Sequence, residues 1–281
     1  MIQERLVRLG PDFDQVALAC LDWGDAAARR TVVCVHGLTR NAHDFAVLAE
    51  ALADRGARVI AVDMVGRGHS SWLADPQGYR VEVYAAQMRR LIGLLGLGRI
   101  DWIGTSMGGL IGMVVAAAAD SPIDRLVLND IGPSVASATL DQIRSYLGLD
   151  LLFRDLGELE AHLRTIHAGF GRLTDEQWAF LARTSSRETP DGLRLHYDPA
   201  IREPFLLDTA GGLDLWAAWD AIACPTLVLH GAESPLLTDD ILGEMRRRRP
   251  GTEVVTFPEV GHAPALMATD QIATILRWLR L

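Results

Sequence analysis

A serine flanked by glycines marks the point where an apolar run gives way to a run of small residues. The pattern Gly-x-Ser-x-Gly occurs at Gly104, Ser106 and Gly108. The run before it is typical of a strand and the run after it of a helix, which places Ser106 on a sharp strand-to-helix turn. Small residues on both sides let the two elements approach closely. This context predicts that Ser106 is a nucleophile; the alternative is an ordinary serine at a helix start.

A serine hydroxyl is a weak nucleophile and needs a base that a third group holds in place. The segment Phe257–Pro264 places His262 in a turn after the last predicted strand, and we expect this imidazole to be the base. His36 and His69 belong to loops shaped by glycine and are weaker candidates. Three other histidines fall in the helical region described below: His162, His167 and His196.

Two backbone amides are candidates for stabilising an oxyanion. His36-Gly37-Leu38 follows a short β-branched run, and Gly37 permits an unusual turn there, so the amide of Leu38 can face the reacting carbonyl. The second candidate is the amide of Met107, directly after Ser106. Without the serine, the same sequence is typical of a plain strand-to-helix loop.

Apolar runs of strand length alternate with amphipathic helical runs over most of the chain, which predicts an α/β fold with a mostly parallel sheet. Residues 5–23 are predicted to form an opening hairpin. The glycine-punctuated loop at 64–71 lacks a complete nucleotide-binding pattern, so we reject a nucleotide site. The predicted strands that follow the hairpin cover residues 31–35, 58–63, 100–105, 123–130, 224–230 and 253–257.

The alternation stops between Ser134 and about Leu213, where the sequence predicts several amphipathic helices and little strand. Thr139–Gln142 and Thr174–Gln177 fit capping boxes. A helical insertion at this point is a natural lid over the strand ends, where such sheets bind ligands. We therefore predict three segments: a first part of the core at 1–133, a cap or lid at 134–213, and a second part of the core at 214–281.

Five motifs in this order make the chain resemble the α/β-hydrolase fold family over nearly its whole length. The resemblance implies an eight-stranded, mostly parallel sheet flanked by helices, a helical cap between strands six and seven, and neither cofactor nor metal. The matching segments are Val35–Leu38, Asp63–Ser70, Gly104–Gly108, Cys224–Gly231 and Gly261–His262.

The acid of the expected triad departs from the commonest pattern of that family. Members usually place an aspartate in the loop after strand seven, but Ser234 and Pro235 occupy those positions here. Asp130 ends strand six on the same rim as Ser106, where some members of the family place their acid. We therefore predict the triad Ser106, His262 and Asp130, with Glu233 as the alternative acid. Asp130 would otherwise be a carboxylate that binds loop amides.

Substrate recognition is expected in the cap and in the loop after Leu38. Arginine pairs with carboxylates through two parallel hydrogen bonds, so an arginine that faces the cleft would select a carboxylated substrate. Arg40 is the best placed, and Arg144 and His167 are further candidates in the cap. Any single arginine on an amphipathic helix is otherwise a surface residue.

The composition is that of a globular protein with a formal charge of -9 over 281 residues. This charge gives no general attraction to nucleic acid or to anionic membranes. The amino-terminal residues are charged and contain no apolar signal core, so we expect a cytoplasmic location. The cysteines lack metal-ligand spacing and are expected to be reduced packing residues: Cys20, Cys34 and Cys224.

Three functions fit these features. The first is a cofactor-free serine hydrolase that cleaves a small ester, lactone or related acyl compound through an acyl-enzyme. The second is hydrolysis of a carbon–carbon or amide bond in the breakdown of a carboxylated aromatic or heterocyclic compound. The third is a non-catalytic ligand-binding or signalling protein on the hydrolase scaffold, which the altered loop at Ser234 and Pro235 keeps open.

Overall fold

The computed structural model describes residues 2–207 and 212–281. Its main sheet has eight strands in the order β1-β2-β4-β3-β5-β6-β11-β12, and the six from β4 to β12 run parallel. This is the predicted mostly parallel eight-stranded sheet. The strands are β1 (Gln3–Arg8), β2 (Ala17–Trp23), β3 (Thr31–Val35), β4 (Arg58–Val62), β5 (Ile100–Thr105), β6 (Ile123–Asn129), β11 (Thr226–Gly231) and β12 (Glu253–Phe257).

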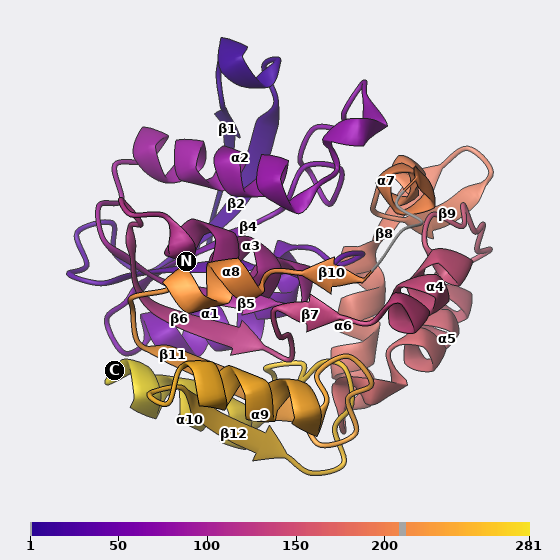
Figure 1. Cartoon of the computed structure of the whole chain (residues 1–281). Helices are drawn as coiled ribbons and strands as arrows, with labels where there is room; N and C mark the ends of the chain where they lie inside the picture. Colours follow the sequence, from indigo (N-terminus) through magenta and orange to yellow (C-terminus); the bar gives the residue numbers. More distant parts are fainter. Residues whose placement is uncertain (1, 208–211) are drawn as a thin grey trace.

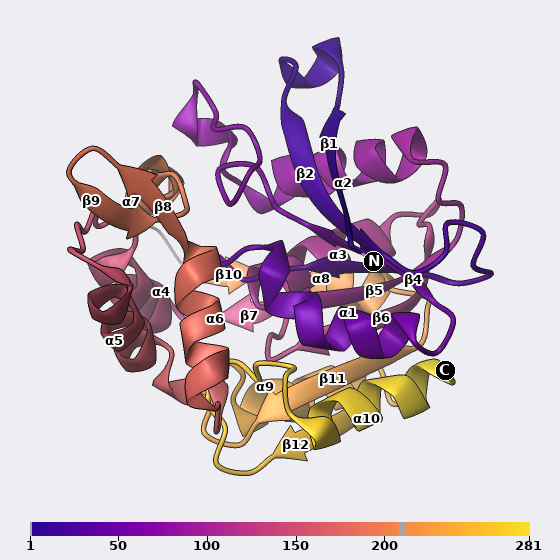
Figure 2. The ribbon, with the colours of Figure 1, turned by 180° about the vertical axis from the view of Figure 1, so that it is seen from behind.

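Helices cover both faces of this sheet, as the wholly apolar strands require. In Figure 1, α2 and α8 lie in front of the sheet together with α3 and α9, whereas Figure 2 shows α1 and α10 on the opposite face. These helices are α1 (Ala46–Ala53), α2 (Val81–Leu94), α3 (Met107–Ala117), α8 (Trp216–Ala221), α9 (Asp239–Arg248) and α10 (Thr269–Leu279).

Strand β3 shows why two cores form. Successive side chains of a strand point to opposite faces. Val33 and Val35 accordingly pack in the core under α2 and α3, and Val32 and Cys34 pack in the core under α1 and α10. All four side chains are fully or almost fully buried. The central strands are therefore packed on both faces. We call the edge of the sheet formed by their carboxyl ends, with the loops that follow, the rim.

The opening hairpin is antiparallel, as predicted. Strand β1 pairs with β2 over its whole length, from Gln3 opposite Asp22 to Arg8 opposite Ala17. Most of β1 is exposed, whereas β2 is largely buried because it also pairs with β4. The hairpin extends the sheet away from the rim and carries none of the candidate site residues.

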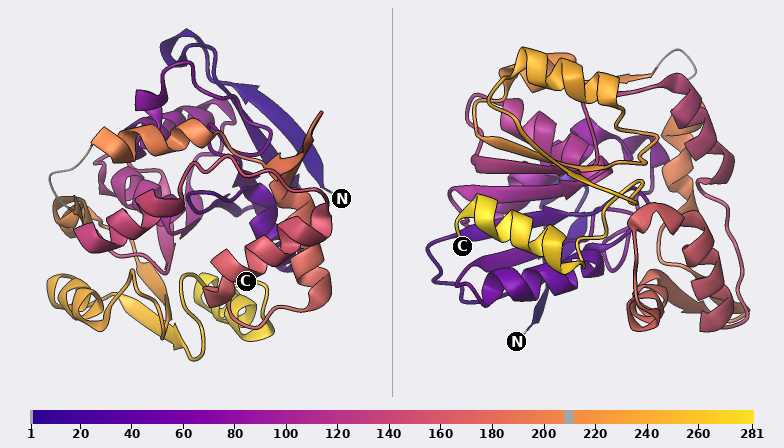
Figure 3. Two further views of the ribbon diagram at one scale, coloured as in Figure 1. Left: turned by 90° about the vertical axis from the view of Figure 1, so that its right-hand side faces the viewer. Right: turned by 90° about the horizontal axis from the view of Figure 1, so that it is seen from below.

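We call residues 134–213 the cap segment, and its described residues lie beyond the carboxyl ends of the strands (Figures 1 and 3). The two-residue strands β7 (Ser134–Val135) and β10 (Leu213–Asp214) pair antiparallel where the chain leaves and rejoins the core. Residues 208–211 of this segment lie outside the described residues. Its other elements are α4 (Ser137–Tyr146), α5 (Leu156–Ile166), α6 (Asp175–Ser185), β8 (Ser186–Thr189), β9 (Gly192–Leu195) and α7 (Glu203–Leu207).

Two local expectations for the cap segment need correction. It contains a β-hairpin, because Pro190-Asp-Gly192 is a strong turn sequence and Gly192 adopts a φ of 140° that favours glycine. The predicted capping box at Thr139 is absent, since α4 already begins at Ser137 and places Thr139 inside its first turn. The box at Thr174 and Gln177 is present. The division into core and cap stays a prediction.

Within the described residues, the model has no helix that is both long enough and apolar enough to span a lipid bilayer.

Candidate active site

Ser106 occupies a strained turn between β5 and α3. Its φ of 50° and ψ of -113° are unusual for a residue with a side chain. The turn requires glycine next to it: a Cβ on Gly108 would lie 1.9 Å from the carbonyl oxygen of Val35, and one on Gly104 would lie 2.2 Å from that of Gly108. The local sequence therefore aims the Ser106 hydroxyl away from the sheet, at the rim.

A chain of hydrogen bonds links Ser106 to His262 and Asp130. Nε2 of His262 lies 2.9 Å from Oγ of Ser106, and Nδ1 lies 2.8 Å from Oδ2 of Asp130. A carboxylate only accepts hydrogen bonds, so Nδ1 carries the proton and Nε2 accepts from the serine hydroxyl. The three predicted side chains thus come together from three separate loops on the rim.

Asp130 is fully buried and its carboxylate is fixed from two sides. Besides His262, it accepts a hydrogen bond of 2.8 Å from the backbone amide of Gly231, through Oδ1. The backbone of Asp130 adopts a φ of 55° as the chain turns out of β6. Both acceptor oxygens are therefore occupied, which fixes the orientation of the carboxylate toward the imidazole.

Glu233, the alternative acid, lies in the loop after β11 with an exposed side chain. Its backbone amide donates to the carbonyl oxygen of Val260, at 2.8 Å, which orders the loop before His262. Within the described residues, its carboxylate makes no hydrogen bond or ion pair with the imidazole. The structure therefore brings His262 together with Asp130 and not with Glu233.

Asn129 is a positioning residue that the sequence did not reveal. This fully buried side chain donates through Nδ2 to Oγ1 of Thr105, at 3.0 Å, and to the carbonyl oxygen of Pro264, at 2.8 Å. One amide group thus joins the strand before Ser106 to the loop after His262. Only its position directly before Asp130 at the end of a strand pointed to this role.

The amide of Leu38 lies on the loop after β3, and that of Met107 is at the start of α3, directly after Ser106. Within the described residues neither amide donates a hydrogen bond to another group, whereas the next amide, that of Gly108, donates to the carbonyl oxygen of His36 at 3.1 Å. Both residues line a cavity that also contains Ser106. These two amides are therefore available to a ligand atom at the serine.

His36 shapes the loop that carries Leu38. Its Nδ1 donates to the carbonyl oxygen of Gly37, at 2.7 Å, and its Nε2 accepts from the amide of Met64, at 2.9 Å. Complete burial lowers the pKa of His36 to about 3, so the imidazole is neutral near pH 7. The expected structural role of this histidine agrees with these contacts.

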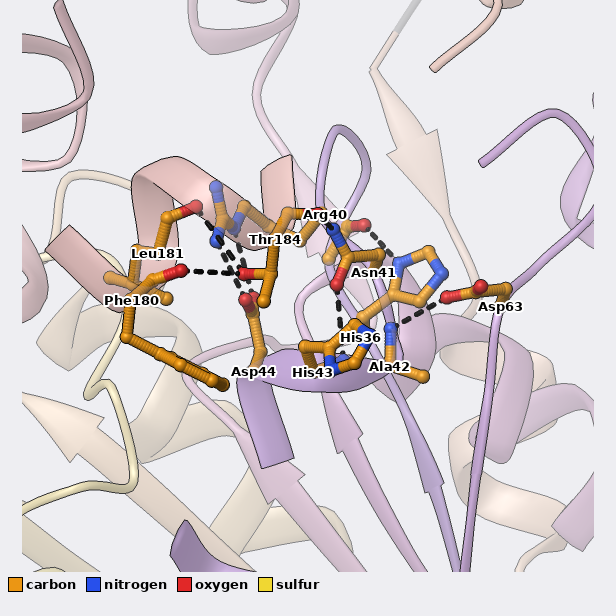
Figure 4. A network of polar contacts seen from close by, with 11 residues as sticks. His36, Arg40, Asn41, Ala42, His43, Asp44, Asp63, Phe180, Leu181 and Thr184 are labelled. Carbon is orange, nitrogen blue, oxygen red and sulfur yellow. Dashed lines mark hydrogen bonds and ion pairs between the residues drawn. The ribbon is translucent and has the colours of Figure 1, made fainter. Parts of the chain in front are cut away.

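Arg40 lines the larger cavity but is already paired. Its side chain is almost fully buried and donates two hydrogen bonds to Asp44, at 2.9 and 2.6 Å (Figure 4). The neighbouring Asn41 donates to the carbonyl oxygen of Thr184 in α6, at 2.8 Å, and so ties this loop to the cap segment. Because Asp44 offsets its charge, Arg40 is a weaker attractor for carboxylates than expected.

Two cavities meet at Ser106. The larger, of about 300 Å³, lies between the rim and the cap segment, and the smaller, of about 230 Å³, extends toward α2 and α4. Ser106 and Leu38 line both. His167 lines the larger cavity and Arg144 the smaller. The walls of the larger cavity are mainly apolar, with residues such as Ile143, Leu149, Leu163, Phe170, Leu181 and Leu236.

The two other predicted substrate residues are held by the cap segment itself. The ring of His167 stacks on Phe170 at 4.4 Å between centroids, and burial lowers its pKa well below the usual range, with Arg40 adding to the effect. Arg144 donates to the carbonyl oxygen of Phe205, at 2.7 Å, and pairs with Asp141. Their roles toward a substrate stay predictions.

The loop Asp63–Ser70, which the sequence singled out without a role, packs behind the serine. Asp63 accepts hydrogen bonds from the amides of Ala42 and His69, at 2.7 and 2.9 Å. Arg67 is fully buried and donates to the carbonyl oxygen of Leu38, at 2.9 Å. Sequence alone did not indicate this partner, because it lies 29 residues away on another loop.

No three His, Cys, Asp or Glu side chains gather to hold a metal ion within residues 2–207 and 212–281. The three cysteines are free. Cys20 and Cys34 belong to the two cores, and burial raises the pKa of both thiols above the usual range. They pack as apolar side chains, as expected.

The parallel sheet, the serine turn and the histidine after the last strand define a protein of hydrolase type. The chain belongs to the alpha/beta hydrolase family: the model of the alpha/beta hydrolase fold matches residues 30–267. The structure of a putative hydrolase from Rickettsia typhi matches with a TM-score of 0.92 and 32% identity, covering 100% of this chain and 99% of that chain. Both the family and the fold inferred from the sequence are therefore confirmed.

Two curated relatives narrow the comparison. The chain is 44% identical to the 3-hydroxybutyrate-oligomer hydrolase of Cupriavidus necator over 265 residues, which cover 91% of this chain and 90% of that enzyme. It is 29% identical to the 2-(acetamidomethylene)succinate hydrolase of Mesorhizobium japonicum over 231 residues, or 81% of this chain and 79% of that enzyme. The relatives support a hydrolase.

Proposed function

We propose that this protein is a serine esterase that hydrolyses short esters of hydroxy acids, including linear 3-hydroxybutyrate oligomers. The observation that carries the proposal is the hydrogen-bonded chain Ser106, His262 and Asp130 at the junction of two cavities. This geometry supports the roles of nucleophile, base and orienting acid for the three residues, and the two cavities support an extended ester as the substrate.

In the first half of the reaction, His262 takes the proton of Ser106 as Oγ attacks the ester carbonyl. Asp130 holds the imidazole in the required tautomer and stabilises the imidazolium that forms. The amides of Leu38 and Met107 donate to the oxygen that becomes negative. His262 then gives its proton to the leaving alkoxide as the carbon–oxygen bond breaks, which leaves an acyl-enzyme on Ser106.

In the second half, a water molecule replaces the released alcohol. His262 takes its proton while the hydroxide attacks the acyl carbon, and the same two amides stabilise the second oxyanion. Collapse of this intermediate breaks the bond to Oγ, which regains its proton from His262. All proton transfers use side chains of this chain, and the products are an alcohol and a carboxylic acid.

The two cavities support an extended substrate. An ester bound with its carbonyl at Ser106 has an acyl arm and an alcohol arm, and a separate cavity is present for each. In an oligomer of a hydroxy acid both arms carry further ester units. The similarity to a 3-hydroxybutyrate-oligomer hydrolase, at 44% identity over most of both chains, favours this class among extended esters.

The polar groups of the larger cavity also suit hydroxyl and ester oxygens. His167 is neutral near pH 7 because its pKa is lowered, so its ring offers one donor and one acceptor. The ion pair with Asp44 offsets the charge of Arg40, so Arg40 gives this cavity little attraction for an anionic substrate. Apolar side chains between these groups match the methyl and methylene parts of a short hydroxy acid.

Hydrolysis of linear 3-hydroxybutyrate dimer and trimer by wild type, Ser106→Ala and Glu233→Gln tests the proposal, with a p-nitrophenyl butyrate assay alongside. We expect turnover of both oligomers, a loss of at least about a thousandfold in Ser106→Ala, and little change in Glu233→Gln. Turnover that survives in Ser106→Ala would refute the serine mechanism. Cleavage of the p-nitrophenyl ester without cleavage of either oligomer would refute the substrate class.

A second candidate is hydrolysis of a carboxylated amide or of a carbon–carbon bond. Similarity to a 2-(acetamidomethylene)succinate hydrolase and the presence of an arginine in each cavity favour it. Arg40→Ala separates the candidates, since it would impair carboxylated substrates selectively under this second function. A loss equal for carboxylated and uncharged esters would leave the esterase proposal as the better account.

A further inference from the structure

A buried guanidinium lies behind the candidate oxyanion site and has no role in the mechanism so far. Arg67 is 0% exposed, and in the described part of the chain no carboxylate forms an ion pair with it. Burial of a charge without a counter-charge is costly. The contacts of the Arg67 side chain indicate what this buried charge does in the site.

Arg67 touches both residues whose amides are the candidate oxyanion donors. Its Nε donates to the carbonyl oxygen of Leu38, at 2.9 Å, and its Nη2 lies 3.6 Å from the sulfur of Met107. The planar guanidinium has a rigid fork of donors, so these two contacts hold the Leu38 loop next to the Met107 side chain at the start of α3. The placement of the Leu38 loop sets the distance between the two amides.

Further hydrogen bonds and aromatic rings hold the guanidinium in place. Nη1 donates to the carbonyl oxygen of Val65, at 2.8 Å, and to the hydroxyl of Tyr84, at 2.7 Å. The rings of Tyr79 and Tyr84 lie 5.7 and 5.2 Å from the guanidinium carbon, a geometry that favours a cation. Asp198 accepts from the Tyr79 hydroxyl, at 2.5 Å, and not from Arg67.

The same loop is tied to the cap segment through its backbone. The amide of Gly68 donates to the carbonyl oxygen of His196, at 2.9 Å, and the amide of Asp198 donates to that of Gly66, at 2.8 Å. Arg67 itself forms an isolated bridge with Tyr197. The guanidinium is therefore held by residues of the core, while the backbone of the loop that carries it is tied to the cap segment.

We infer that Arg67 is a positioning residue for the oxyanion hole. It holds the Leu38 loop and Met107 at a fixed separation, and its positive charge in a site of low dielectric constant favours the negative oxygen of the tetrahedral intermediate. The inference rests on the proposed function. An uncharged ester gains little from this field, whereas the oxyanion gains much, so the effect falls on kcat more than on KM.

The test compares Arg67→Met and Arg67→Lys with Arg58→Met as a matched control. Arg58 is also a buried arginine, but it pairs with Asp22 at the amino end of β4, away from the rim. For each variant the fraction of protein labelled by a serine-directed phosphonate gives the number of competent sites. Then kcat and KM for p-nitrophenyl butyrate are expressed per labelled site.

We expect Arg67→Met to lower kcat per site about 10- to 100-fold with KM changed less than about threefold. Arg67→Lys should lie between this variant and wild type, because it keeps the charge without the fork. Affinity for a boronic acid, which forms an anionic adduct with Ser106, should fall in parallel, while affinity for the uncharged alcohol product should not. Arg58→Met should keep its kcat per site.

A kcat per site within twofold of wild type in Arg67→Met would overturn the inference, and so would a loss that lies only in the labelled fraction. If Arg67→Met does not fold, Arg67→Lys decides in the same way: wild-type kcat overturns the inference and a lowered kcat at constant KM supports it. The turnover of wild type and Ser106→Ala is measured first. If wild type shows no turnover that depends on Ser106, the proposed function is refuted, and not the inference about Arg67.

Discussion

The core rim and the cap segment enclose the same site, but they are held in different ways. On the rim, buried polar groups bind partners on other loops: Asp130 binds His262 and Gly231, and Asn129 binds Thr105 and Pro264. The cap segment presents mainly apolar and aromatic side chains to the larger cavity. From this difference we expect the rim to fix the reacting groups and the cap segment to select which molecules fit beside them.

Asp130→Asn is the sharpest way to test the role of the rim. An amide at this position orients the wrong imidazole tautomer, so we expect kcat to fall by about 10⁴-fold, as in other triads. The measurement is turnover of p-nitrophenyl butyrate, corrected for the fraction labelled at Ser106. Glu233→Gln is the control and should keep wild-type activity. If Asp130→Asn remained active while Glu233→Gln collapsed, the assignment of the acid would be wrong.

Stability should depend on pH through buried histidines in both regions, and His36 is the one on the rim. The pKa of His36 is about 3 in the folded protein against about 6.5 when exposed, so below pH 6.5 the unfolded chain binds a proton that the native protein does not. Stability therefore falls as the pH drops from about 6.5 toward 3. Between pH 7.5 and 5 we expect His36 to account for about 2 kcal/mol of the loss in the free energy of unfolding.

Unfolding in guanidinium chloride, at these two pH values, measures the free energy of unfolding of wild type, His36→Gln and His162→Gln. His36→Gln should be less stable at pH 7.5 but lose less on acidification. His162, in the cap segment, is only partly buried and its pKa is lowered less by burial, so His162→Gln should change the pH dependence less. An equal or larger effect of His162→Gln would contradict the assignment of this loss to the deep burial of His36.

For the cap segment, the corresponding test is Phe170→Ala. Phe170 lines the larger cavity, stacks on His167 and lies 6.0 Å from the guanidinium of Arg40. Loss of this ring should raise KM about 10-fold with kcat nearly unchanged, because bound substrate loses apolar contact without any change at Ser106. Kinetics with esters of increasing acyl length measure the effect.

Trp72→Ala is the matched control for Phe170→Ala, since Trp72 is 44% exposed and lines neither cavity. It should leave both kinetic constants close to those of wild type. A large fall in kcat with constant KM in Phe170→Ala would contradict the expected roles of the two regions, because it would show that the cap segment also orders the reacting groups.

The smallest expected effect distinguishes two helices within the cap segment. Thr174 caps α6 and accepts from the amide of Gln177, at 3.2 Å, whereas Thr139 caps no helix. Thr174→Ala should lower the free energy of unfolding by about 1 kcal/mol, and Thr139→Ala should change it little. Urea unfolding measures both. A similar cost for the two substitutions would show that capping does not explain the stability of α6.

Much of the rim could be predicted from the sequence because its motifs are local. Gly104, Ser106 and Gly108 specify their turn within five residues, and the turn after β12 places His262 with few alternatives. The choice between Asp130 and Glu233 needed geometry, since each lies near a strand end. No pattern indicated a role for Arg67, because its contacts are with Leu38 on the loop after β3 and with Met107 at the start of α3.

In the cap segment, prediction was limited by the weakness of local signals. Helical periodicity gave the helices, and the capping box at Thr174 was right. The hairpin at 186–195 was missed although Pro190-Asp-Gly192 is a turn signal, since its strands are short and their side chains only partly buried. Which cap residues face the cavity depends on how the helices pack, which no short pattern encodes.

The β7–β10 ladder has a consequence for how this family can diversify. Ser134 stands opposite Asp214 and Val135 opposite Leu213, so the insertion begins and ends at neighbouring points. A segment attached in this way places no demand on the path of the strands before or after it. We therefore expect that grafting at this ladder can exchange one cap segment for another without changing the path of the strands beneath it.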